Sequence, residues 1–251
     1  MIVYKTAEEL DKMRRAGRIV AGTIERVIAA VKAGRTTADL DRVAERYIDS
    51  EGAVPSFKGY RGFPASICAS VNQEIVHGIP SKKRVLADGD LLSLDFGAIW
   101  EGFHADSAVT VFVGGRAPSP EAEKLVRVTE ESLEAGVAAI RPGARLSDIG
   151  AAIQQVAEGA GFSLVQEYGG HGIGRALHED PFIPNYGPGG RGPELRPGLV
   201  VAIEPMVNLG GHETRLLTDD WTVVTADGSL SAHFEHTIAV TDDGHEILTT
   251  R

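Results

Sequence analysis

Five residues dispersed along the chain carry side chains that could together hold metal ions: Asp95, Asp106, His171, Glu204 and Glu235. Each lies in an apolar or glycine-rich stretch, where a charged side chain destabilises the fold unless something compensates it. Four carboxylates and one imidazole are typical of a site that binds two divalent ions and hydrolyses its substrate. Convergence of these five side chains would make the chain a metallohydrolase.

The first two carboxylates, Asp95 and Asp106, lie in apolar segments on either side of a turn near residues 99–102. In an antiparallel hairpin with a two- or four-residue loop there, both side chains would point to the same face, opposite or nearly opposite each other. Like charges in that arrangement repel, and a cation between them reverses the sign of the interaction. The alternative is that Asp95 ends a strand and Asp106 takes part in a turn.

The other three residues have equally unusual surroundings. Glu204 follows a run of apolar or small residues, and Glu235 enters another apolar strand. Glycines flank His171 and would let backbone and ligands approach closely. This stretch lacks the Lys-Ser/Thr pair of a phosphate-binding loop. A single histidine is more often structural than a ligand, so the metal site is predicted from the whole set.

An internal repeat relates two halves of the chain. Two pairs of segments share one offset of 109 residues: 34–40 with 143–149, and 89–95 with 198–204. Asp95 and Glu204 therefore occupy equivalent positions. We expect a single catalytic domain over residues 1–251, with halves at roughly 7–113 and 116–241.

Each half has the pattern of two helices followed by strands. Helices are predicted over 7–33 and up to about residue 50, with counterparts at about 120–140 and 146–160. Seven strands are predicted: 65–71, 91–100, 104–113, 163–168, 199–208, 221–225 and 235–241. Gly34 would stop the first helix, Thr37 or Asp39 would cap the second, and the Pro- and Gly-rich stretch 180–198 would be a surface loop. This order predicts an α+β fold of antiparallel sheet backed by helices.

The composition narrows the class of protein. The 251 residues are 43% hydrophobic, enough for a sizeable core. A net charge of −10 and a pI near 5.3 argue against nucleic acid or an anionic membrane as the main partner. No apolar run reaches the 18 residues of a membrane span, and the N-terminus lacks the pattern of a signal peptide. The lone cysteine, Cys68, excludes an internal disulfide and fits a reducing cytosol.

Taken together, these motifs resemble the type I methionine aminopeptidases of peptidase family M24, which have the pita-bread fold. The resemblance covers nearly the whole chain and is carried by six stretches in order: 70–80, 90–106, 168–174, 178–181, 203–205 and 218–237. It implies two pseudo-symmetric halves, in agreement with the repeat. It also implies a cytoplasmic, monomeric enzyme that removes the N-terminal methionine of nascent polypeptides. Docking at the ribosome is left open.

The resemblance implies metal-binding roles for the four carboxylates and the imidazole. The ligands of two divalent ions (Co, Mn, Fe or Zn) would be Asp95, Asp106, His171, Glu204 and Glu235. Asp95 would bind one ion through both oxygens, and Asp106 and Glu235 would bridge the pair. A monovalent cation near Asn72 and Ser231 is a further expectation.

The resemblance also implies the catalytic residues and the substrate pocket. Glu204 would be the general base, His178 would donate to the scissile carbonyl oxygen, and His77 would contact the leaving amide nitrogen. The methionine pocket would be lined by Tyr60, Phe63, Cys68, His77, His178 and Trp221. Phe63 and Leu177 depart from residues common in relatives, which affects the pocket shape. Structural or surface roles are expected for His104, His212, His233, His236 and His245.

Other functions on the same scaffold remain as alternatives. One is an X-Pro aminopeptidase or prolidase, whose members usually carry an additional N-terminal domain. Another is a non-catalytic peptide-binding protein, whose members have lost metal ligands. A metal-free amidinohydrolase of the creatinase type is a third, which the complete ligand set disfavours.

Overall fold

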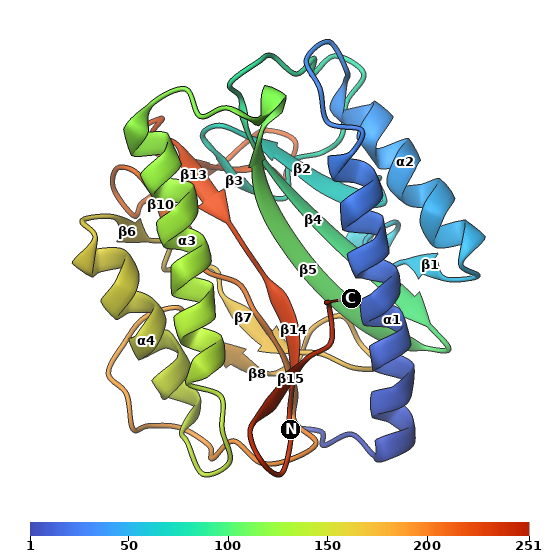
Figure 1. Ribbon diagram of the computed structural model, residues 1–251, viewed down its shortest axis with the longest axis vertical. Helices are drawn as coiled ribbons and strands as arrows, with labels where there is room; N and C mark the ends of the chain where they lie inside the picture. Colours follow the sequence, from blue (N-terminus) through green and yellow to red (C-terminus); the bar gives the residue numbers. More distant parts are fainter. Residues whose placement is uncertain (251) are drawn as a thin grey trace.

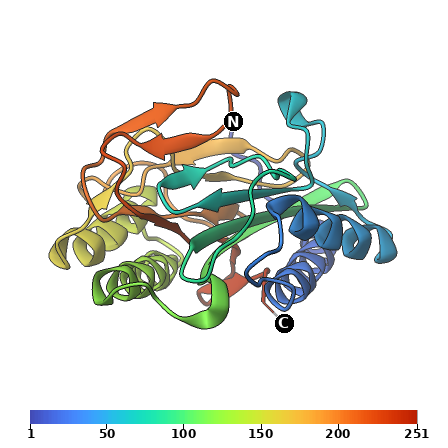
Figure 2. The ribbon, with the colours of Figure 1, turned by 90° about the horizontal axis from the view of Figure 1, so that it is seen from above.

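Two pairs of helices cover one side of the strands in the computed structural model, which describes residues 1–250 (Figure 1). The pairs are α1 (Ala7–Ile28) with α2 (Thr37–Ser50), and α3 (Pro120–Ala138) with α4 (Leu146–Gly159). Figure 2 shows both pairs in one layer, with the strands in a second layer above them. The predicted α+β layering is therefore confirmed.

The helix ends follow from local hydrogen bonds rather than from glycine alone. The hydroxyls of Thr6 and Thr36 accept bonds from backbone N–H groups three residues on, and acidic side chains return the bond in both capping boxes. The prediction that Thr37 or Asp39 caps α2 was wrong by one residue, because Asp39 serves as the reciprocal partner of Thr36. Helix α1 ends at Ile28, before Gly34, because i→i−3 hydrogen bonds tighten the chain directly after it.

The first-half sheet is built around a long hairpin of β4 (Leu91–Trp100) and β5 (Phe103–Phe112). Strands β1 (Val54–Pro55) and β2 (Ile67–Val71) pair with the other edge of β4. A two-residue turn joins the hairpin, and Glu101 and Gly102 both have positive φ there. This turn fits the twist of the flanking strands and fixes their register.

The second-half sheet contains five strands in the order β15, β14, β9, β7 and β8. Their bounds are β7 (Gly170–Gly172), β8 (Glu179–Ile183), β9 (Val200–Ile203), β14 (His236–Val240) and β15 (His245–Ile247). The predicted loop over 180–198 was wrong at its start, since β8 forms the edge of this sheet. An edge strand tolerates Pro181 because one side of it needs no partner.

Two small three-stranded sheets complete the fold. One is formed by β6 (Ser163–Leu164), β10 (Met206–Asn208) and β13 (Ser231–His233), and the other by β3 (Glu74–Val76), β11 (Thr214–Leu216) and β12 (Val223–Thr225). The strand predicted over 199–208 is thus split into β9 and β10. The split falls at Glu204-Pro205, where proline cannot donate a ladder hydrogen bond.

The two halves repeat the same local pairing and meet at one seam. Isolated bridges join Thr36 to Val85 and Arg145 to Glu194, so each residue lies 109 positions from its counterpart. Separate apolar cores lie under each helix pair. At the seam, Ala108 and Glu235 exchange both backbone hydrogen bonds (3.3 and 3.0 Å). The seam places the middle of β5 beside the start of β14.

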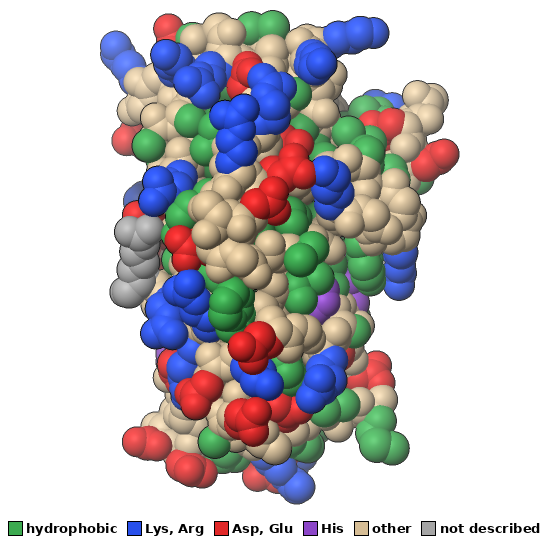
Figure 3. Space-filling view, turned by 90° about the vertical axis from the view of Figure 1, so that its right-hand side faces the viewer, with side chains coloured by type: hydrophobic (Ala, Val, Ile, Leu, Met, Phe, Trp, Pro, Cys, Tyr) green, Lys and Arg blue, Asp and Glu red, His purple; other side chains and the backbone are tan. Residues whose placement is uncertain are grey.

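Charge is unevenly spread over the surface. Figure 3 shows Lys and Arg side chains gathered toward one end of a face and Asp and Glu side chains more frequent toward the other. None of the helices in residues 1–250 combines the length and apolar character needed to cross a membrane.

Candidate active site

The β4–β5 hairpin places the first two acidic side chains on one face of the sheet. Gly97 lies opposite Asp106, and Asp95 lies opposite Ala108. Asp95 and Asp106 are therefore diagonal neighbours, not a directly opposed pair, and they share the face that points away from the helices. Cys68 lies opposite Asp95 on β2 and joins the same face.

The second-half sheet brings the remaining three residues to the same place. Ala202 on β9 pairs with His171 on β7, and Glu204 directly follows β9. Glu235 precedes β14 and is tied to β5 through the seam. The hydroxyl of Ser107 also donates to the Glu235 carbonyl (2.6 Å). Residues separated by more than a hundred positions in sequence thus become neighbours.

Three of the five side chains could share a metal ion as they stand. Ligand atoms of Asp106, His171 and Glu235 lie within 4.8 Å of one another, and all three residues are buried. The Nε2 atom of His171 is 3.6 Å from the Oε1 atom of Glu204. Its Nδ1 atom bonds to the Gly172 carbonyl (2.9 Å), which leaves Nε2 directed at the carboxylates.

Several carboxylate oxygens in this cluster have no protein partner. Buried oxygens of Asp95, Asp106 and Glu235 lack any hydrogen bond. Burial raises the pKa of Asp95 to about 7. Burial first, and neighbouring carboxylates second, raise the pKa of Asp106, Glu204 and Glu235 well above the ordinary range. Unpartnered acidic oxygens with one imidazole nitrogen fit a divalent cation, which would supply the missing compensation.

The metal-free protein should lose stability as the pH rises above about 6.5. A carboxyl group whose pKa is raised by folding stabilises the folded state below the unfolded pKa, and that stability is lost as the pH rises through the folded pKa. Asp95 has an unfolded pKa of 3.8 and a folded pKa of about 7, so its own contribution is lost by about pH 7. The pKa values of Asp106, Glu204 and Glu235, raised well above the ordinary range, extend the loss to higher pH. Each such group lowers the free energy of unfolding by about 1.4 kcal/mol for every pH unit between its unfolded and folded pKa values. Each kcal/mol lost lowers Tm by about 2–4 °C.

Buried histidines confine this fall in stability to pH values above about 6.5. Burial lowers the pKa of His77 and His171 below 6.5, so they oppose the carboxyl groups only below that pH. Thermal unfolding of EDTA-treated protein should therefore show Tm falling from pH 6.5 to 8.5. Divalent ions need deprotonated ligands, so their stabilising effect should grow over the same range. A rising Tm in the metal-free protein would contradict the assignment of protons to this cluster.

A cavity of about 260 Å³ opens directly onto the carboxylates. Every residue predicted to bind the two divalent ions or the substrate, or to catalyse the reaction, lines it: Tyr60, Phe63, Cys68, His77, Asp95, Asp106, His171, His178, Glu204, Trp221 and Glu235. Leu177, already expected to affect the pocket shape, lines it too, and the structure adds Phe57, Arg61 and Tyr168 to the wall. A second, more open cavity of about 560 Å³ shares His77, His178 and Glu204 with the first.

The apolar wall of the first cavity is formed by packed aromatic rings. The rings of Phe63 and Trp221 meet edge to face, with centroids 5.0 Å apart. The imidazole of His77 lies 6.1 Å from Trp221 and 6.0 Å from Tyr168. Aromatic edges of this kind pack well against a thioether.

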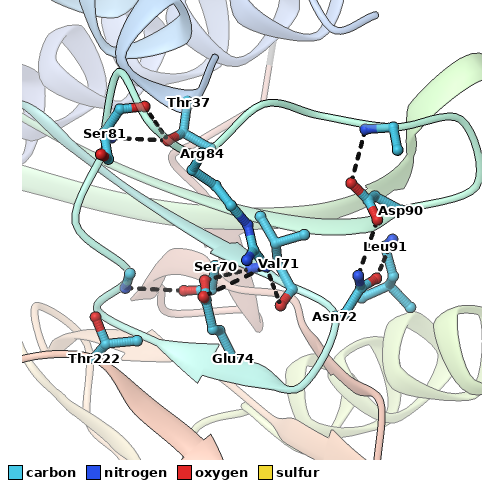
Figure 4. A network of polar contacts seen from close by, with 12 residues as sticks. Thr37, Ser70, Val71, Asn72, Glu74, Ser81, Arg84, Asp90, Leu91 and Thr222 are labelled. Atoms are coloured by element: carbon cyan, nitrogen blue, oxygen red, sulfur yellow. Dashed lines mark hydrogen bonds and ion pairs between the residues drawn. The ribbon is translucent and has the colours of Figure 1, made fainter. Parts of the chain in front are cut away.

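Polar contacts hold His77 in an uncommon backbone conformation. Its φ is +61°, in the left-handed region that non-glycine residues adopt only when their surroundings impose it. The next residue, Gly78, donates its N–H to the Ser70 hydroxyl (3.1 Å). In Figure 4, Glu74 accepts from the Val71 N–H (2.8 Å) and faces the Arg84 guanidinium (3.5 Å). These contacts fix the turn that carries His77 toward the cavity.

Tyr60 and an ion pair position His178. The Tyr60 hydroxyl lies 2.8 Å from Nδ1 of His178, and the two rings stack. The next residue, Glu179, accepts from the Ala176 N–H (3.2 Å) and pairs with Lys5 (2.6 Å). Burial, followed by the charges of His171 and Arg61, lowers the pKa of His178. A neutral ring that accepts a hydrogen bond at Nδ1 carries its hydrogen at Nε2 and can donate it.

Sequence reasoning missed several residues of this site. Phe57 and Tyr168 read as ordinary core or loop positions, and the exposed Arg61 lies in a glycine-rich turn. His233 was expected to be structural, yet its Nε2 atom is 3.9 Å from Oε2 of Glu204. Its position two residues before Glu235 on a short strand was the one available signal.

The fold and the acidic cavity define a metallopeptidase. Residues 11–242 match metallopeptidase family M24, and the chain belongs to this family. Within it, methionine aminopeptidase 1 of Bacillus subtilis (strain 168) is 56% identical over 249 residues, which make up 99% of each chain.

Solved structures agree with this placement. Methionine aminopeptidase from Thermotoga maritima is 45% identical, covers 100% of both chains and has a TM-score of 0.98, which confirms the predicted pita-bread fold. Prolidase from Pyrococcus furiosus has a TM-score of 0.81 but is 22% identical, and the match covers 66% of that chain. That likeness shows a shared fold only, so the full-length similarity favours the methionine aminopeptidases over the X-Pro peptidases.

Proposed function

We propose that this chain is a metal-dependent aminopeptidase that removes the N-terminal methionine from nascent polypeptides. One observation carries the proposal: unpartnered acidic oxygens from both halves open into a small cavity whose far wall is aromatic. The acidic end suits divalent ions and the aromatic end suits an unbranched thioether side chain. Full-length similarity to methionine aminopeptidases supports the same activity.

The proposed ligands of two divalent ions are Asp95, Asp106, His171, Glu204 and Glu235. Their oxygen and imidazole donors are compatible with Co, Mn, Fe or Zn. When bound, such ions polarise the scissile carbonyl and acidify a water molecule. The monovalent cation expected near Asn72 and Ser231 belongs to the same proposal, and the Ser231 N–H donates to the Asn72 carbonyl (3.0 Å), so the two residues are neighbours.

The protein groups around the ligands would move protons and hold the substrate. Glu204 is partly exposed to the cavity and its pKa is raised, so it can take a proton and pass it to the leaving amine. His178 Nε2–H would donate to the carbonyl oxygen as negative charge develops there. His77 would contact the amide nitrogen from the other side of the shared opening. The second cavity offers room for the residues that follow the scissile bond.

The shape of the cavity predicts selectivity for methionine. With metal-loaded enzyme, kcat/KM for Met-Ala-Ser should exceed that for Leu-Ala-Ser by roughly 10–200-fold, the range that apolar pockets achieve between similar side chains. A branched side chain should pack less well than an unbranched one against the edge-to-face rings of Phe63 and Trp221.

The same assay separates the alternatives. An X-Pro aminopeptidase would cleave Leu-Pro-Ser faster than Met-Ala-Ser, and a non-catalytic binding protein would cleave neither peptide. Metal content should be measured beforehand on the same sample. Faster turnover of Leu-Ala-Ser or Leu-Pro-Ser would overturn the proposed substrate class.

The proposed setting is the cytoplasm, as a monomer that acts on chains as they emerge from the ribosome. The substrate class and a buried, unpaired cysteine support this setting. Sedimentation of the protein with and without translating ribosomes would test both the oligomeric state and the docking. Nucleic-acid specificity and membrane binding are not expected from a net charge of −10.

A further inference from the structure

The Glu204 carboxylate lies between two imidazole rings. On one side, its Oε1 atom is 3.6 Å from Nε2 of His171. On the other, its Oε2 atom is 3.9 Å from Nε2 of His233. His171 belongs to the proposed ligand set, whereas His233 is not among the residues that line either cavity at this site. Any contribution of His233 must therefore act through Glu204.

His233 is a buried polar side chain with an unused hydrogen-bonding atom. The residue is 2% exposed, and its Nε2 atom has no hydrogen-bond partner. Leaving such an atom unpaired is unfavourable unless a partner comes within reach. The nearest carboxylate oxygen is Oε2 of Glu204, which accepts no direct hydrogen bond from a protein group.

The backbone of His233 is held firmly enough to aim this ring. The Thr110 hydroxyl donates to the His233 carbonyl (2.7 Å) and accepts from its N–H (2.9 Å). The same hydroxyl lies 2.8 Å from that of Ser93 on β4. The backbone of Glu204 is held in turn, since the Asn185 amide donates to its carbonyl (3.0 Å). Both partners are therefore fixed at the main chain and free only in their side chains.

The hydrogen-bonding capacity of the ring suits a donor. A neutral imidazole carries one hydrogen, on either of its two ring nitrogens. With that hydrogen on Nε2, the ring can donate a hydrogen bond to an anionic oxygen. Being neutral, it does not compete as a cation with metal ions for the carboxylate. The 3.9 Å separation exceeds the ordinary hydrogen-bond range, so forming the bond requires one of the two side chains to rotate.

We propose that His233 is a positioning residue that donates an Nε2–H hydrogen bond to Oε2 of Glu204 and fixes the direction of this carboxylate. Glu204 would then present Oε1 to the metal centre beside His171, in the orientation that proton transfer also needs. The inference rests on the proposed function only in taking Glu204 as a metal ligand. Partners of this kind around metal ligands typically change metal affinity or activity by 10–100-fold when they are removed.

Substitutions at His233 test the hydrogen bond through metal affinity. His233→Leu keeps the approximate volume but removes the donor, and it should weaken Mn²⁺ binding, measured by isothermal titration calorimetry, on the order of 10–100-fold. His233→Gln keeps an N–H donor and should stay within about threefold of the wild type. Turnover of Met-Ala-Ser should fall for the leucine variant mainly in kcat, with KM little changed. His245→Leu, at an exposed histidine outside both cavities, is the control and should change neither quantity.

Two further measurements keep the proposal falsifiable. If His233→Leu does not fold, His233→Asn replaces it, because its shorter amide cannot reach Glu204 and it should weaken Mn²⁺ binding as the leucine variant would. In the Glu204→Gln background, removing the His233 donor should have no additional effect on Mn²⁺ affinity. The proposed role would be overturned if His233→Leu bound Mn²⁺ with wild-type affinity. It would also be overturned if His233→Gln and His233→Leu lost the same Mn²⁺ affinity. Metal affinity does not depend on which peptide is cleaved, so failure here is separate from failure of the methionine selectivity.

Discussion

Asp106→Asn is expected to remove activity by about 10³-fold or more, together with loss of bound metal. Removing one well-placed catalytic donor already costs 10²–10³ in rate, and a metal ligand supports several such interactions at once. Asp106 is central to the cluster because its ligand atom lies close to those of both His171 and Glu235. Metal content by elemental analysis and kcat/KM on Met-Ala-Ser should fall together.

The same substitution should stabilise the metal-free protein. Asp106 is 4% exposed and has an unpartnered oxygen, so its ionisation above neutral pH is unfavourable in the folded state. Asparagine has nearly the same shape and does not ionise, and Tm in EDTA at pH 8 should therefore rise by several degrees. Asp243→Asn replaces an exposed carboxylate outside the cavities and should alter neither Tm nor metal content. A variant at Asp106 that retained metal and turnover would remove this residue from the ligand set.

Much of the fold was predictable because the chain repeats itself. The offset of 109 residues relates the α1–α2 turn to the α3–α4 turn, and the structure has a β-bridge at equivalent positions in both. Hydrophobic spacing predicted the four helices and the β4–β5 hairpin. The short strands were harder, because β7 depends on pairing with β9, and β8 on pairing with β7, rather than on their own composition.

The candidate site residues could be predicted from the sequence for a related reason. A charged residue inside an apolar strand is visible in the sequence because its burial is unfavourable without a partner. His233 gave no such signal, since a neutral histidine is acceptable in a core and its relation to Glu204 depends on the distance between β13 and the end of β9. Phe57 is similar, because an aromatic side chain that lines a cavity and one that fills a core have the same local pattern.

His178→Ala should lower kcat on Met-Ala-Ser by 10²–10³-fold, the usual effect of removing one donor to a developing oxyanion. Metal content should not change, because the His178 ring is outside the predicted ligand set although its centroid is 4.2 Å from that of His171. KM should change far less than kcat if the hydrogen bond strengthens only as charge develops on the carbonyl oxygen. Wild-type kcat in this variant would exclude the role.

Tyr60→Phe separates the donor from the group that orients it. The Tyr60 hydroxyl is 2.8 Å from Nδ1 of His178, and its removal leaves the imidazole in place but frees the choice of tautomer. The loss should be on the order of tenfold in kcat, smaller than that of His178→Ala, and it should be absent in the His178→Ala background. An equal loss in both backgrounds would mean that Tyr60 acts on the substrate directly, because a residue that works through His178 has no effect once that ring is gone.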